Sequence, residues 1–167
     1  RVVGGIWPDD IDGPAFREAM PQALAQHQLT LFDPGRLQLA APDYTGIATR
    51  LRDAGVQMLT GVLPPPVALA FFEAARKVGY QPRMASIAKA FPFPETVAAI
   101  DAPGMALTNE VWWSPAWPFR SGWTGATSQQ VAQEYEQRTR QPWVQTLGFS
   151  HALVDLAAQA VQEAEAA

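Results

Sequence analysis

The segment from Gly148 to Ala152 reads GFSHA and differs from the G-x-S-x-G nucleophile elbow only in its last residue. In that arrangement an acidic residue and then a histidine follow the serine along the chain. The two histidines, His27 and His151, do not supply this order for Ser150. We therefore predict a small-residue face of a helix here, and we expect no enzyme, because no other nucleophile, base or metal cluster stands out.

The segment PDDIDGPAFREA imitates a calcium loop, because Asp10, Asp12 and Gly13 fit part of the EF-hand pattern. If Gly13 is the sixth loop position, Pro8 and Ala19 fall where carboxylates are required. The alternative is a turn that enters a helix, whose dipole favours acidic residues. With two histidines and no cysteine a zinc site is also improbable, so we expect neither a metal nor a cofactor.

Several side chains follow predicted strands and are candidates for contact with a small molecule. In open α/β sheets ligands bind outside the carboxyl ends of the strands. The candidates are Trp7, Asp12, Pro64, Lys89 and Trp113. Each has a simpler explanation, since tryptophans commonly pack in cores and a lysine is usually a solvated surface residue. Both interpretations stay open for these residues.

The elements that would position these residues are clearest between Asp43 and Tyr80. Residues 43–55 have apolar side chains at helical spacing and end in Gly55, which predicts an amphipathic helix. Residues 56–63 form an uncharged apolar run, typical of a strand covered on both faces. Three prolines then break the strand, and a proline is favoured in the first turn of the helix predicted over residues 67–79.

The rest of the chain extends this alternation. We predict strands over 1–7, 28–40, 82–88 and 104–113, the second of them broken by the turn cluster at residues 33–35. Helices are predicted over 13–27 and 93–100, the first of them kinked or split at Pro21. The fold class is therefore α/β, with a doubly wound parallel sheet of about five strands. After Trp113 the sequence predicts only a loop and two helices, over 127–140 and 147–166, so we place a boundary between residues 1–113 and 114–167.

Composition limits the possible partners. The chain of 167 residues is 48% hydrophobic and has a net charge of −4 without a basic cluster, which argues against nucleic acid and anionic membranes. No apolar run approaches the roughly 20 residues of a membrane span, and no signal peptide is visible. The chain begins at Arg1 directly in a strand-like run, so we expect a piece of a longer protein.

Taken together, three segments resemble the type I periplasmic solute-binding proteins of ABC importers, in particular the class that binds branched-chain amino acids. They are VVGGIWPDDIDGPAFREAMP, DYTGIATRLRDAGVQMLTGVLPPPVALAFFEAARKVGYQPRM, and TNEVWWSPAWPF followed by LGFSHALVDLAAQAVQEA. The resemblance implies that residues 1–113 form the second of two lobes, that residues 112–118 belong to the hinge, and that the last two helices return to a first lobe that this chain lacks. It also implies a periplasmic or extracytoplasmic location and an ABC permease as partner.

The resemblance further implies a ligand site in the cleft between the lobes. Aromatic residues that line it in the family fall here on Asp12 and on Leu63 with Pro64. The acidic residue that meets a ligand ammonium falls near Ala88 and Lys89, where this chain has no carboxylate. We therefore expect a small organic or aromatic acid, paired with Lys89 and stacked on Trp7 or Trp113, more than an amino acid.

Two further expectations concern function and assembly. The alternative function is a ligand-sensing domain of a receptor or regulator, because the resemblance extends to receptors with the same architecture. The last two helices carry apolar faces. Without a first lobe these faces must fold onto this lobe, pair with another copy or stay exposed, and we predict a dimer or a swapped assembly.

Overall fold

The computed structural model describes residues 1–41 and 43–165. The chain forms two compact units, Arg1–Glu110 and Val111–Ala167, and each is described by itself. The sequence analysis placed the boundary a few residues later, after Trp113.

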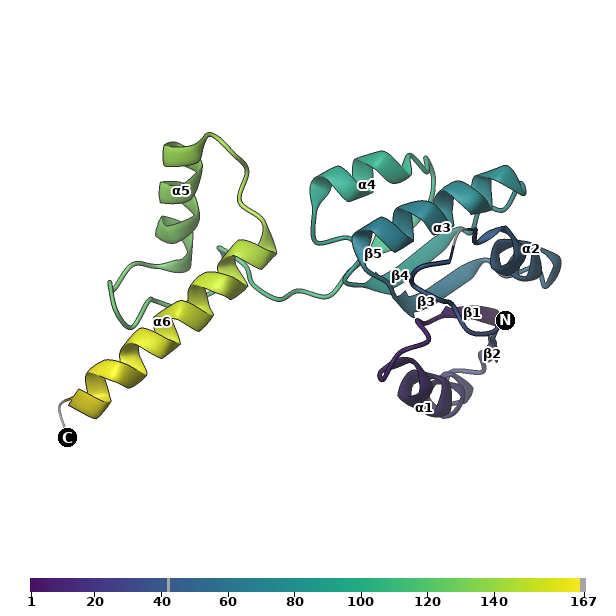
Figure 1. The fold of residues 1–167 in the computed structure, drawn as a ribbon, viewed down its shortest axis with the longest axis horizontal. Helices are drawn as coiled ribbons and strands as arrows, with labels where there is room; N and C mark the ends of the chain where they lie inside the picture. The colour runs from purple at the N-terminus through teal and green to yellow at the C-terminus, as the bar shows by residue number, and fades with distance from the viewer. Residues whose placement is uncertain (42, 166–167) are drawn as a thin grey trace. The chain divides into compact units, whose positions relative to one another are not determined.

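The first unit is built on one parallel sheet (Figure 1). Its strands are β1 (Val2–Ile6), β2 (Thr30–Phe32), β3 (Met58–Val62), β4 (Met84–Ala88) and β5 (Ala106–Thr108). The strand order is β2-β1-β3-β4-β5, and all four neighbouring pairs are parallel. The chain leaves β1 in one direction to form β2 and then continues on the other side with β3. The order therefore reverses between β1 and β3, which makes this the topological switch point of the sheet.

Four helices connect the strands of this sheet. They are α1 (Gly13–Ala25), α2 (Thr45–Asp53), α3 (Pro65–Lys77) and α4 (Pro94–Ile100). Figure 1 shows α1 on one side of the sheet and α2, α3 and α4 on the other. The predicted α/β fold with a doubly wound parallel sheet is confirmed.

The ends of α2 and α3 follow from their sequences. Pro65 is the first residue of α3, where a missing N–H removes no helical hydrogen bond. Gly55 and Gly79 follow α2 and α3 with φ of +66° and +70°, a left-handed conformation that glycine adopts without steric penalty. Pro65 therefore marks the start of α3, and the two glycines mark the ends of α2 and α3.

The core lies mainly between the sheet and the helices α2, α3 and α4 (Figure 1). Side chains alternate along β3 and β4, and Leu59, Ala85 and Ile87 are fully buried. They pack with Leu51 from α2 and Phe71 from α3. On the α1 side of these two strands Met58, Thr60, Met84 and Ser86 are only half-buried, whereas Val62 is buried. The two faces of the sheet are therefore covered unequally by the residues described.

Two expectations about individual elements were wrong. The fifth strand is short, because β5 is an edge strand that pairs with β4 only from Ala106 to Thr108. Pro21 does not split α1, which runs continuously through it from Gly13 to Ala25. The proline lacks an N–H for one helical hydrogen bond, but the bonds on either side maintain the helix.

The second unit contains two helices, α5 (Ser128–Thr139) and α6 (Gln145–Glu165). Thr127 and Gln130 form a capping box that begins α5, with each side chain accepting a backbone N–H of the other residue. Several large apolar side chains of α6 are exposed, including Phe149, Leu153 and Leu156. The dimer expected from these helices stays a prediction. Within residues 1–41 and 43–165, no helix combines the length and the apolar character needed to cross a membrane.

Candidate functional site

A cavity of about 370 Å³ lies in the first unit, along the carboxyl halves of the strands on the side that carries α1. We call it the carboxyl-edge cavity. It borders the switch point between β1 and β3, where ligands of open α/β sheets bind. Strands, α1 and the residues just after β1 and β5 all contribute, namely Trp7, Phe16, Met20, Thr60, Gly61, Val62, Ser86, Ala88, Asn109 and Glu110.

The sheet supplies a mixed apolar and polar wall to this cavity. Thr60 of β3 and Ser86 of β4 are paired in register, so their side chains stand next to each other on the same face. Both are half-buried and both line the cavity. Two hydroxyl groups, each able to donate and to accept, therefore lie in the middle of an otherwise apolar surface.

Trp7 lines the cavity but is itself part of the packing. Its side chain is 1% exposed, and its ring lies parallel to that of Phe16 with 6.4 Å between centroids. The ring also covers Gly5, where a Cβ would come within 2.0 Å of it. Arg17 fixes the surrounding loop by donating to the carbonyl oxygens of Trp7 and Gly35. Trp7 therefore offers at most an edge of its ring to a ligand.

Asn109 and Glu110 are two further polar residues of the cavity that, like Thr60 and Ser86, the sequence analysis did not identify. Glu110 Oε1 accepts the backbone N–H of Lys89 at 2.7 Å, which joins the end of β5 to the residue after β4. Glu110 Oε2 and both polar atoms of the Asn109 side chain are buried, and none of them has a hydrogen-bond partner in the described part of the chain. An unpaired buried polar atom is costly, so these three atoms are the polar groups of the cavity lining that most need a partner.

Four of the predicted site residues lie in the first unit but outside the lining of this cavity. Asp12 is exposed just before α1, and Leu63 is completely buried in the core. Pro64 is half-buried and precedes the first turn of α3. The Lys89 side chain is exposed and its backbone has a φ of +66°. Of the predicted residues, Trp7 lines the cavity. Lys89 is connected to the cavity lining by the hydrogen bond from its backbone N–H to Glu110.

Trp113, the last predicted site residue, belongs to the second unit and packs within it. Its ring lies 5.0 Å from that of Trp143, between centroids. It also lies over Gly148, where a Cβ would come within 2.2 Å of the indole. In this unit the aromatic side chain therefore holds the start of α6, as expected for a packing residue.

The simpler interpretations of the two motifs agree with the structure. Asp10 Oδ1 accepts the backbone N–H groups of Asp12 and Gly13, so this segment is the turn that leads into α1. Ser150 is an exposed residue within α6. In the ranges 1–41 and 43–165, no three His, Asp or Glu side chains gather in a way that could hold a metal ion.

Comparison with known proteins points to one family. A family model described as "Periplasmic binding protein" matches residues 3–167. Among solved structures, a fatty acid ABC transporter substrate-binding protein from Thermomonospora curvata is similar in fold, with a TM-score of 0.62 and 15% identity. That match covers 84% of this chain and 35% of the other, so this chain spans about a third of the length of that protein. No curated protein sequence matches this chain.

Proposed function

This chain belongs to the periplasmic binding protein family, and we propose that it forms one ligand-binding lobe of a solute-binding protein that serves an ABC importer. In this proposal the lobe captures a small molecule and does not transform it. The ligand would be held in a cleft of which the carboxyl-edge cavity forms one wall, and closure around it would be recognised by the permease.

The observation that carries the proposal is the position of the carboxyl-edge cavity. It lies at the carboxyl ends of the strands beside the switch point, and it combines apolar walls with a few polar groups, as small-molecule sites do. The buried and unpaired atoms of Asn109 and Glu110 strengthen the argument, because they offer both a donor and acceptors. A purely structural surface would leave fewer such groups without partners.

The polar groups of the cavity also bear on the class of ligand. The organic or aromatic acid predicted from Lys89 finds little support, because the Lys89 side chain is exposed and does not line the cavity. The charged residue of the lining is Glu110, whose carboxylate repels an anion and attracts a group that carries N–H or O–H donors. We therefore propose a ligand with an ammonium, amide or hydroxyl group directed at Glu110, a class that includes amino acids.

The location and partner follow from the family. We propose that the protein acts outside the cytoplasm and delivers its ligand to an ABC permease.

Calorimetric titration of the full-length protein tests the proposal. The panel contains amino acids, amines, uncharged amides and polyols, and small aromatic acids. We expect a donor-bearing compound to bind, and Glu110→Gln to weaken it by roughly 10-fold to 100-fold, the range for a hydrogen bond to a charged group. Glu18→Gln, an exposed change on α1 outside the lining, is the matched control. Tight binding of an aromatic acid that is unaffected by Glu110→Gln would refute the ligand class.

A further inference from the structure

A second cavity, of about 220 Å³, lies at the opposite edge of the sheet, where β4 and β5 begin. We call it the amino-edge cavity. One of its walls is the segment 79–82, which follows α3, and the other is the segment 101–105, which follows α4. Phe72 and Ile100 contribute buried apolar surface between these walls.

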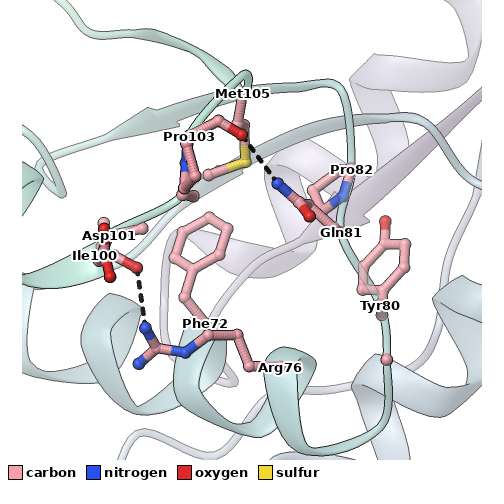
Figure 2. Close-up of a pocket in the computed structure, with 11 residues that line it drawn as sticks. Phe72, Arg76, Tyr80, Gln81, Pro82, Ile100, Asp101, Pro103 and Met105 are labelled. Atoms are coloured by element: carbon pink, nitrogen blue, oxygen red, sulfur yellow. Dashed lines mark hydrogen bonds between the residues drawn. The ribbon is translucent and has the colours of Figure 1, made fainter.

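Two hydrogen bonds connect the walls of the amino-edge cavity, as Figure 2 shows. Arg76 Nη1 donates to the carbonyl oxygen of Ile100 at 3.3 Å, and Gln81 Nε2 donates to that of Pro103 at 3.1 Å. The first bond joins the last turn of α3 to the last residue of α4. The second bond joins the two wall segments, so the cavity lies between two helix ends that are linked by hydrogen bonds.

Tyr80 is one of the residues that line this cavity, and its hydroxyl group is buried. The residue is 4% exposed and its hydroxyl has no hydrogen-bond partner among the described residues. Burial raises the pKa of this hydroxyl above the ordinary value of a tyrosine, so it stays a neutral O–H donor at physiological pH. A phenol in an apolar setting normally finds an acceptor when it is buried.

The size and charge of the cavity limit what it can hold. Apolar protein cavities of about 150 Å³ take up benzene, so the space here fits one ring with a short substituent. Arg76 and Asp101 place one charge of each sign in the lining. The carbonyl ends of α3 and α4 also converge here and disfavour an anion. An uncharged ligand meets no net electrostatic penalty from this arrangement.

We propose that the amino-edge cavity is a second binding site, for an uncharged single-ring compound whose oxygen acceptor takes the hydrogen bond of the Tyr80 hydroxyl. The site is separate from the carboxyl-edge cavity, with which it shares no lining residue. It does not depend on the proposed transport function. A compound bound there contacts the ends of α3 and α4 and would stabilise the first unit by binding the folded state alone.

Nuclear magnetic resonance titration of the ¹⁵N-labelled whole chain tests this site. The probes are acetophenone, which carries an acceptor, and ethylbenzene, which has the same ring and a similar length without one. We expect both to shift the amides of Gly79, Gln81 and Gly104 in a saturable way, with acetophenone binding more tightly. Benzoate is expected to bind more weakly than acetophenone.

Variants make the test specific. Tyr80→Phe is expected to weaken acetophenone roughly twofold to tenfold, the range of one neutral hydrogen bond, and to leave ethylbenzene unchanged. Tyr135→Phe makes the same change outside the lining and is the control. Ala102→Phe fills the cavity and is expected to abolish both interactions. Shifts confined to the amides around Thr60 and Ser86, or an equal effect of Tyr80→Phe on both probes, would overturn the proposal.

Discussion

Tyr44 and Tyr80 form a matched pair that tests how buried hydroxyl groups contribute to the stability of the first unit. Both residues are 4% exposed. The Tyr44 hydroxyl donates to the carbonyl oxygens of Gln38 and Leu39, each at 3.0 Å. The Tyr80 hydroxyl has no partner in the described ranges. Removing the two hydroxyl groups should therefore change the free energy of unfolding in opposite directions.

The magnitudes follow from the environments. Burying an unpaired hydroxyl costs about 1–3 kcal/mol, so Tyr80→Phe should raise the free energy of unfolding by about 1 kcal/mol. Tyr44→Phe removes a made hydrogen bond and should lower it by about 1 kcal/mol. With a urea dependence of roughly 2 kcal/mol/M, the two unfolding midpoints should move apart by roughly 1 M. Urea unfolding of both variants, followed by circular dichroism, measures this difference.

Titration adds a second signature for Tyr80. Its folded pKa is raised by burial, whereas the unfolded side chain ionises near pH 10. Below about pH 10 the Tyr80 phenol is therefore neutral in both the folded and the unfolded state, and its ionisation does not reduce the free energy of unfolding. Above that pH the free energy of unfolding falls by up to about 1.4 kcal/mol per pH unit, because only the unfolded state releases the proton. Tyr80→Phe should remove this decrease. If Tyr80→Phe instead lowers stability at pH 7 by 1 kcal/mol or more, the hydroxyl has a partner and the reasoning is refuted.

Two further predictions concern close packing and a capped loop. A Cβ at Gly61 would lie 2.2 Å from the carbonyl oxygen of Ile6, so Gly61→Ala should lower the free energy of unfolding by about 1–3 kcal/mol. Gly46→Ala, at an exposed position of α2 with nothing near the added methyl, should raise the free energy of unfolding by roughly 0.5 kcal/mol; urea unfolding compares the two variants. The Ser121 hydroxyl and the next two backbone N–H groups donate to Asp155 and lower the pKa of its carboxyl below 3.8. The stability that these hydrogen bonds to the Asp155 carboxylate contribute is therefore present above about pH 4 and lost as the pH falls below it. Asp155→Asn should speed amide hydrogen exchange in the loop around Ser121 at neutral pH. A carboxylate that was merely exposed would not produce this effect.

Much of the fold could be predicted because the sequence marks its own boundaries. Gly55 and Gly79 end two helices, Pro65 begins one, and the uncharged run between them is a strand covered on both faces. These signals are local, because each depends on the conformational preference of one residue or on the periodicity of a short segment. The length of β5 is not local. It depends on how far the edge strand pairs with β4, which no pattern within residues 104–113 reveals.

The error at β5 explains why the site was only partly predicted. Asn109 and Glu110 were counted as part of a long strand, so their side chains were not considered as groups that follow the strand end. The strand stops at Thr108, and the Glu110 carboxylate then turns back to the amide of Lys89. The sequence did contain a signal, an amide and a carboxylate directly after an apolar edge strand. The prediction drawn from Lys89 gave the candidate site a positive charge, whereas the charged residue that lines the carboxyl-edge cavity is Glu110.

The two faces of the sheet show why the carboxyl-edge cavity lies on the α1 side. Three helices cover the other face, and there Leu59 and Ile87 are buried and unavailable. Neighbouring positions on the same strands, Thr60 and Ser86, face α1 and stay half-buried. A strand exposes alternate residues to opposite faces, so one sequence can place apolar side chains in the core and hydroxyl groups in the wall of the cavity. Threonine also favours strands, so Thr60 places a hydroxyl group on the half-exposed face without weakening the strand, while Leu59 beside it stays on the buried face.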